Sequence, residues 1–225
     1  WSSDVCSSDL PIVYIQTVVG RDERSGEPVV RGLFAGEGLD CFYRAADLAA
    51  EINVTVLDEA PEHVVAWLDP SEFHSTWLGN KAIYRSRMAL ADGGTLTVLA
   101  PGVETFGEDT EIDRLIRRFG YRGTPATLEA VRRNPELEGN LSAAAHLIHG
   151  STEGRFRVEY AAGKLSREEV ERAGFDYAEL NKLEKRGITP KTLTEGWNTL
   201  PDGERVYYLS APALGLWAHR DRFVV

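Results

Sequence analysis

Hydrophobic and polar positions alternate with two different periods along the chain, and each change of period marks the edge of an expected element. Short apolar runs rich in β-branched residues predict strands, whereas apolar residues that recur every three to four positions predict amphipathic helices. The expected strands are 11–19, 29–34, 53–57, 63–68, 95–99, 156–160 and 205–210. The expected helices are 39–51, 80–91, 109–119, one that opens at Thr124-Pro125, 140–149, 166–173 and 177–185. This alternation favours an α/β fold with a mostly parallel or mixed sheet flanked by helices.

The first ten residues differ from the rest of the chain. Range 1–10 looks like a translated sequencing adapter, so we expect the native sequence to start at Pro11. It has neither the charged start and apolar stretch of a secretory leader nor the Arg-rich pattern of a transit peptide. We therefore expect 11–58 to be the trailing part of a truncated N-terminal domain. Range 59–225 is then expected to form a C-terminal domain, because the acidic, proline-containing stretch 58–62 resembles a boundary.

Charge and cysteine content narrow the classes of partner. Without Asp4 and Asp9, the 35 acidic residues fall to 33 against 25 basic ones, which is a net charge of −8. This argues against nucleic acid as a partner, because such binding needs a clustered basic face. Cys41 is then the only native cysteine, so we expect no internal disulfide and a cytoplasmic location. We expect no membrane partner, since no apolar run approaches the roughly 18–20 residues that span a bilayer.

The best local candidate for chemistry is a polar loop that runs from the end of a strand into a helix. Ligands of open α/β sheets lie at the carboxyl ends of strands, and helix N-termini favour anions. Lys81 and Arg85 are four residues apart on one predicted helical face, with Tyr84 beside them. Together they can clamp a carboxylate and hydrogen-bond a hydroxyl; a solvated basic face is the alternative. His74 in the same loop is a candidate general acid or base, or else a structural hydrogen-bonding histidine.

Two further patterns admit both a functional and a structural interpretation. His146 and His149 are three residues apart on an Ala-rich predicted helix and could share a metal, but no third ligand is apparent and helix packing is the alternative. The stretch Gly36-x-Gly38-x-x-Cys41 resembles an imperfect dinucleotide fingerprint with a cysteine in place of the third glycine. A cysteine on a helical face more often packs in a core. We therefore assign no metal ligand and no cofactor-binding residue within this chain.

Three stretches occur in an order and at a spacing that indicate a family. They are 80–85 (NKAIYR), 91–102 (ADGGTLTVLAPG) and 143–150 (AAAHLIHG). Together they resemble the C-terminal domain of the nickel-dependent lactate racemase family. The resemblance covers most of 57–217, and 12–48 looks like the tail of that family's N-terminal domain.

The resemblance implies a two-domain α/β isomerase that racemises or epimerises 2-hydroxy acids in an interdomain cleft. The implied cofactor is a nickel-pincer nucleotide held by the N-terminal domain; it takes the substrate α-hydrogen as hydride and returns it to the opposite face. The C-terminal domain is implied to position the substrate, and Tyr84 matches a tyrosine that lines the family site. Arg85 stands where lactate racemases have Gln, and Met88 lies near the position of a Lys. These departures favour a more polar or more acidic substrate than lactate.

The resemblance also implies the partners of this chain, namely a small hydroxy-acid substrate and its own missing N-terminal domain. The cofactor-tethering Lys, the nickel-binding His and the acid/base His pair have no counterpart here, so we expect the fragment alone to be inactive. Two other hypotheses remain open. One is a non-catalytic module of the same fold that binds a small acid or regulates. The other is an enzyme of related fold with a nicotinamide cofactor, for which Gly36-x-Gly38 is the sole support.

Overall fold

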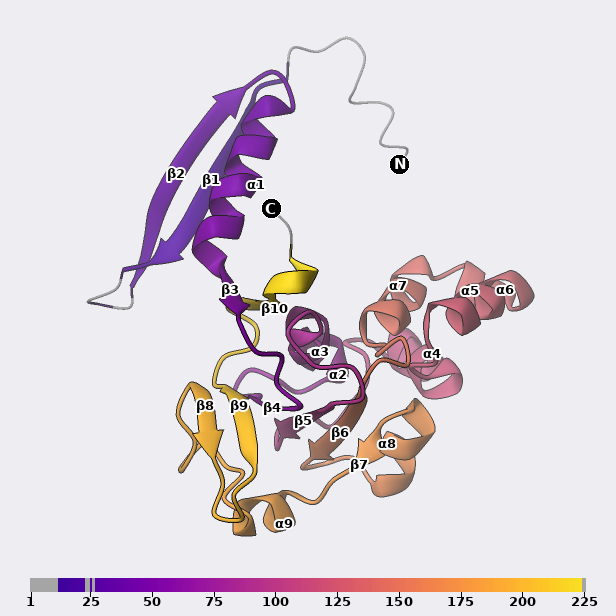
Figure 1. The fold of residues 1–225 in the computed structure, drawn as a ribbon. Helices are drawn as coiled ribbons and strands as arrows, with labels where there is room; N and C mark the ends of the chain where they lie inside the picture. The colour runs from indigo at the N-terminus through magenta and orange to yellow at the C-terminus, as the bar shows by residue number, and fades with distance from the viewer. Residues whose placement is uncertain (1–11, 23–24, 26, 224–225) are drawn as a thin grey trace. The chain divides into compact units, whose positions relative to one another are not determined.

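The computed structural model describes residues 12–22, 25 and 27–223 (Figure 1). The chain divides into two compact units between Thr55 and Val56. Among the described residues, no helix is both long enough and apolar enough to cross a bilayer.

The first unit is a β-hairpin covered on one face by a helix. Strands β1 (Tyr14–Arg21) and β2 (Pro28–Gly36) pair antiparallel, and α1 (Asp40–Asn53) follows them. Gly32 lets the helix approach the sheet, because a Cβ at this position would lie 2.5 Å from a methyl carbon of Leu48. Cys41 is buried, and its thiol donates to the carbonyl of Gly38 at 3.2 Å. The glycine-rich stretch therefore serves the packing of this small unit.

The other face of the hairpin is apolar and uncovered. Ile15, Val30 and Leu33 are 68%, 61% and 67% exposed. The two strands have only each other as neighbours in the described part of the chain. A two-stranded sheet with an exposed apolar face is marginal by itself in water, so α1 supplies most of the burial that this unit has.

The second unit is built on a six-stranded sheet with the order β7-β6-β5-β4-β9-β8. The strands are β4 (His63–Trp67), β5 (Thr95–Ala100), β6 (Arg157–Ala162), β7 (Asp176–Tyr177), β8 (Gly196–Thr199) and β9 (Arg205–Leu209). All neighbouring strands are parallel except β8 and β9, which pair antiparallel. A separate two-stranded sheet joins β3 (Val54–Leu57), where the chain leaves the first unit, to β10 (Leu216–His219). The predicted α/β class with a mostly parallel sheet is confirmed.

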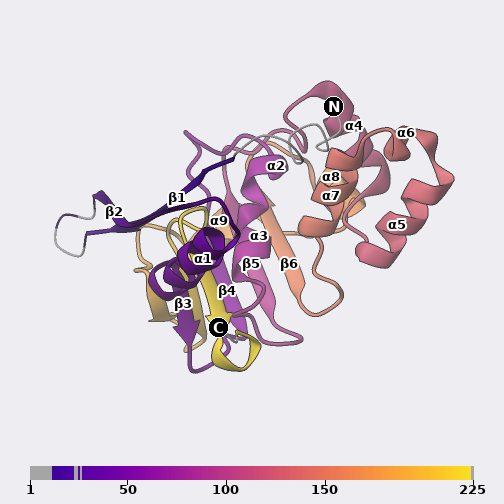
Figure 2. The same ribbon diagram turned by 90° about the horizontal axis from the view of Figure 1, so that it is seen from above.

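Helices cover both faces of the large sheet. They are α2 (Thr76–Gly79), α3 (Lys81–Ser86), α4 (Thr110–Phe119), α5 (Thr124–Arg133), α6 (Pro135–Glu138), α7 (Leu141–His149), α8 (Arg167–Ala173), α9 (Leu180–Lys185) and the short 3₁₀ turn η2 (Arg220–Arg222). Alternate residues of β4 belong to different hydrophobic clusters, with Val64 and Ala66 in the larger cluster and Val65 in the smaller one beside α9. Figure 2 shows α4, α5, α6 and α7 grouped to one side of the parallel strands.

The structure corrects the predicted helix at 80–91. Helix α2 already begins at Thr76, because the side chain of Ser75 accepts a hydrogen bond from the backbone N–H of Leu78 and caps it. Helix α3 ends at Ser86, whose hydroxyl donates back to the carbonyl of Ala82. The predicted helix at 177–185 is also too long, since Tyr177 pairs with β6 and α9 begins at Leu180. At these positions, capping and strand pairing decide where the helices begin, and the spacing of apolar residues does not.

Helix α8 gives the first testable prediction, because a complete capping box holds its N-terminus. The Ser166 hydroxyl accepts from the Glu169 N–H, and the Glu169 carboxylate accepts from the Ser166 N–H at 2.7 Å. Replacing Ser166 by alanine should lower the free energy of unfolding by about 1 kcal/mol, measured by urea denaturation. Ser166→Asp keeps an accepting oxygen at the cap and should cost clearly less; equal losses in both variants would contradict a capping role.

Candidate functional site

A groove of about 340 Å³ lies between the α2–α3 segment and α7. Its lining residues are Trp77, Leu78, Lys81 and Tyr84 from α2 and α3, and Ser142, Ala145, His146 and His149 from α7. The positions on α7 recur at intervals of three and four residues, which is the spacing of one helical face. The groove therefore combines one cation, the aromatic rings of Trp77 and Tyr84, and two imidazoles, from segments about 60 residues apart in sequence.

Two of the four residues predicted from the sequence, Lys81 and Tyr84, line this groove. The ring of Tyr84 lies against that of His149 with a centroid distance of 5.7 Å. Arg85 is not a lining residue, because its guanidinium donates to the carbonyl of Gly215 at 3.1 Å. His74 is exposed and does not line the groove either, and its backbone carbonyl accepts from the N–H of Glu104. Substrate binding by Arg85 and acid/base catalysis by His74 stay predictions.

The histidine pair on α7 belongs to the groove, where the two side chains have different environments. His146 is buried and stacks on Trp77, with ring centroids 4.4 Å apart and an interplanar angle of 29°. His149 is exposed. Within the part of the chain that the structure describes, no group of three or more His, Cys, Asp or Glu side chains could hold a metal ion. Both histidines line the groove from the same face of α7.

A buried chain of hydrogen bonds holds His146 from behind the groove. His146 Nε2 lies 2.9 Å from the Tyr121 hydroxyl, which lies 2.8 Å from Thr76 Oγ1. The Thr76 hydroxyl in turn donates to the carbonyl of Phe106 at 2.9 Å. Burial lowers the pKa of His146 to about 4, with a smaller contribution from His149, so the ring is neutral at pH 7. Burial raises the pKa of Tyr121 above its ordinary value, so the phenol keeps its proton.

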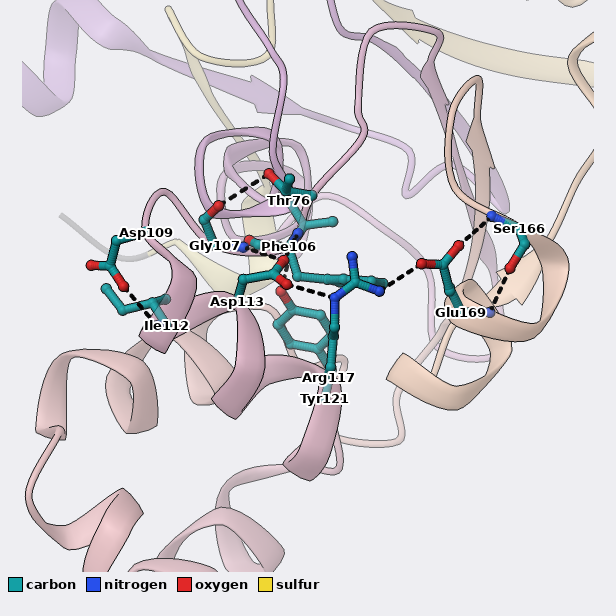
Figure 3. Close-up of polar contacts among 11 residues, drawn as sticks. Thr76, Phe106, Gly107, Asp109, Ile112, Asp113, Arg117, Tyr121, Ser166 and Glu169 are labelled. Atoms are coloured by element: carbon teal, nitrogen blue, oxygen red, sulfur yellow. Dashed lines mark hydrogen bonds and ion pairs between the residues drawn. The ribbon is translucent and has the colours of Figure 1, made fainter.

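The Phe106 peptide at the end of this chain is itself fixed by charged groups (Figure 3). The Phe106 N–H donates to Asp113 Oδ1 at 2.7 Å, and the Gly107 N–H, which shares its peptide with the Phe106 carbonyl, donates to the same oxygen at 3.3 Å. The other oxygen of Asp113 accepts from Arg117 Nε at 2.6 Å. Arg117 then bonds Glu169 at 2.6 Å, which links α4 to the capping box of α8. These side chains are partly exposed, so each ion pair adds only modest stability. Their main effect is to fix the orientation of the Asp113 carboxylate.

Close backbone approach at the end of α7 gives the second prediction. A Cβ on Gly150 would lie 2.4 Å from Asn80 Nδ2 and 2.5 Å from Tyr121 Cε1, and Asn80 is fully buried. Gly150→Ala should therefore lower the free energy of unfolding by about 1–3 kcal/mol through overpacking, measured by urea denaturation. Ser142→Ala on the exposed start of the same helix is the control and should change it by less than about 0.5 kcal/mol. Equal effects of the two variants would contradict the close packing.

A larger cavity of about 1040 Å³ lies at the amino ends of the parallel strands. There His63 bonds Glu204 through Nδ1 at 2.7 Å and Thr97 through Nε2 at 2.8 Å. Glu204 also pairs with Arg186, and Arg205 pairs with Glu59. These groups satisfy one another, so we take the groove between the α2–α3 segment and α7, where Lys81 and Tyr84 lie, as the candidate site.

Two solved structures share this fold. A crystal structure of a protein from Thermotoga maritima aligns with a TM-score of 0.66 at 19% identity, covering 92% of this chain and 49% of that protein. The lactate racemase apoprotein from Thermoanaerobacterium thermosaccharolyticum aligns with a TM-score of 0.57 at 13% identity, covering 90% of this chain and 45% of that protein. This chain has the fold of lactate racemase. It spans about half the length of both structures, and the likeness at these identities concerns the fold alone.

Scans against protein-family models and against curated protein sequences gave no match. The structure brings two of the three stretches together, since 80–85 supplies Lys81 and Tyr84 to the groove while 143–150 supplies His146 and His149. Sequence reasoning missed Trp77 as a groove residue and Tyr121 as the partner of His146. Trp77 precedes Lys81 by four residues, and this helical spacing could have predicted that both side chains lie on one face. Nothing in the sequence around Tyr121 indicates its contact with His146.

Proposed function

We propose that this chain is the substrate-positioning part of a nickel-pincer-dependent racemase or epimerase of 2-hydroxy acids. The observation that supports it is the groove, which in a lactate racemase fold combines the ammonium of Lys81, the phenol of Tyr84 and the neutral imidazole of His146. The proposal includes a cytoplasmic location, in keeping with the free thiol of Cys41.

In this proposal Lys81 binds the substrate carboxylate, since an ammonium on a flexible stem is a compact partner for an anion. Tyr84 hydrogen-bonds a polar substituent, and its ring packs against His149. Trp77 and Leu78 supply an apolar wall that excludes water from one side of the ligand. The groove volume of about 340 Å³ suits a small acid. Arg85 and His74 lie outside the groove, so the proposal does not depend on them.

The described residues contain no group of three or more metal-ligating side chains, so none of them is assigned as a ligand of the cofactor. The proposal places the nickel-pincer nucleotide on an N-terminal domain, which is the expected partner of this chain, and assigns to the chain itself only substrate binding and orientation.

Inversion of configuration in the complete protein tests this proposal. Chiral chromatography of D- and L-2-hydroxy acids should show interconversion by the cofactor-loaded protein, and Lys81→Met should raise KM by about tenfold or more. Lys191→Met is the matched control, since Lys191 pairs with Glu184 and does not line the groove. Absence of inversion for every hydroxy acid would overturn the proposal. Binding without inversion would instead support a non-catalytic small-acid module.

A further inference from the structure

The hydrogen bonds behind the groove run in one direction. The Phe106 carbonyl can only accept, so the single hydroxyl hydrogen of Thr76 points to it. Thr76 Oγ1 must then accept from Tyr121, whose own single hydrogen is thereby used. The Tyr121 oxygen is left as an acceptor for His146, so Nε2 of the imidazole carries a hydrogen.

The reverse direction is less favourable. It would need Thr76 to donate to Tyr121 and Tyr121 to donate to His146 Nε2, and the hydrogen bond from Thr76 to Phe106 would be lost. One net hydrogen bond shifts such an equilibrium about five- to tenfold. The peptide that carries the Phe106 carbonyl ends in the Gly107 N–H, which donates to Asp113 Oδ1 at 3.3 Å. Asp113 is itself bonded to Arg117, and Arg117 to Glu169, so this peptide is held against turning to restore the bond (Figure 3).

The neutral ring of His146 therefore has a bare nitrogen, Nδ1. This atom has no hydrogen-bond partner among the described residues. It is accessible to solvent, because it is absent from the buried polar atoms that lack a partner. Because His146 lines the groove and its ring is held by Trp77 on one side and Tyr121 on another, the lone pair is open to whatever fills the groove.

We propose that His146 Nδ1 accepts a hydrogen bond from the ligand's hydroxyl and selects 2-hydroxy acids over acids that lack this hydroxyl. The inference rests on the proposed function in one respect, namely that the groove binds a small acid through Lys81. Tyr121 and Thr76 are positioning residues, since they set the tautomer without touching the ligand. His146 thus determines specificity by offering an acceptor and no donor.

The tautomer is tested directly by long-range ¹H–¹⁵N NMR of the protein at pH 7, with His146→Gln to assign the signals. We expect a protonated Nε2 and a non-protonated Nδ1. Tyr121→Phe removes the acceptor and should increase the minor tautomer about five- to tenfold. A protonated Nδ1 in the unaltered protein would overturn the inference.

The selection is tested by titrating the protein with lactate and with propanoate, which differ only in the hydroxyl, and following the Trp77 indole signal. The unaltered protein should bind lactate about tenfold more tightly. His146→Phe keeps a ring against Trp77 and should bind both acids equally, whereas Lys81→Met should weaken both. Lys191→Met, which lies outside the groove, is the control and should retain the preference.

The outcomes separate this inference from the proposed function. Equal binding of the two acids by the unaltered protein, with Lys81→Met still weakening both, would overturn the role of His146 and leave the acid site standing. Failure of either acid to bind would overturn the proposed function and this inference together. An unchanged lactate preference in both His146→Phe and His146→Gln would likewise overturn the inference.

Discussion

Replacing Phe106 by alanine should lower the free energy of unfolding of the second unit by about 3–5 kcal/mol, which is the usual cost of truncating a buried phenylalanine. The side chain is 1% exposed, and the Arg117 guanidinium lies 4.8 Å from its ring centroid. The residue also holds the site through its backbone, because its carbonyl accepts from both the Thr76 hydroxyl and the Trp77 N–H. Urea denaturation followed by tryptophan fluorescence measures the loss.

Leu128→Ala is the control for this truncation, since Leu128 is 44% exposed and should lose much less stability. A Phe106→Leu variant refills part of the volume and should recover part of the loss. A change of less than about 1 kcal/mol for Phe106→Ala would contradict the tight core under the 105–107 loop.

Acidification from pH 6.5 to pH 4 should remove roughly 3 kcal/mol of stability through His146 alone. Its pKa in the folded protein is about 4, against an ordinary value of 6.5. The unfolded chain therefore binds a proton at a pH where the folded protein does not, and stability falls as pH falls. The contribution is fully present above pH 6.5 and lost by pH 4, at ~1.4 kcal/mol for each pH unit of that window.

The difference in unfolding free energy between the unaltered protein and His146→Gln, measured by urea denaturation at several pH values, isolates this effect. Protonation of carboxylates also lowers the free energy of unfolding in acid. Glu169 is one, because the Ser166 N–H and then Arg117 hold its pKa below the ordinary value. Their contribution is common to both proteins and cancels. His74→Gln is the control, because His74 is exposed, and it should leave the pH dependence nearly unchanged. A flat difference for His146→Gln would contradict a buried neutral imidazole.

The sequence was informative about the fold where burial alone decides structure. Strands β4 and β5 lie inside a parallel sheet covered on both faces, so they appear as continuous apolar runs. The apolar pattern at 80–91 predicts a helix with the wrong limits, because its start depends on the Ser75 cap and the chain after Ser86 pairs through Met88 with Ala218. Neither contact leaves a periodic signal.

The candidate site was predictable only where its residues are close in sequence. Lys81 and Tyr84 were found from their spacing within one helix. Arg85 follows the same local rule, yet the carbonyl of Gly215, 130 residues away, takes its guanidinium. Tyr121 lies 45 residues from Thr76 and 25 from His146, so only the tertiary fold shows that these hydroxyls and the imidazole meet.

The uncovered face of the β1–β2 hairpin has a consequence for work in solution. Within the ranges that the structure describes, β1 and β2 have no further strand neighbours, and the N–H and C=O groups along such edges can pair with a strand from another molecule. With Ile15, Val30 and Leu33 facing outward, such additions would also bury apolar area. A lysine in place of Leu33, remote in sequence from the groove residues, would put a charge on this apolar face and oppose such additions.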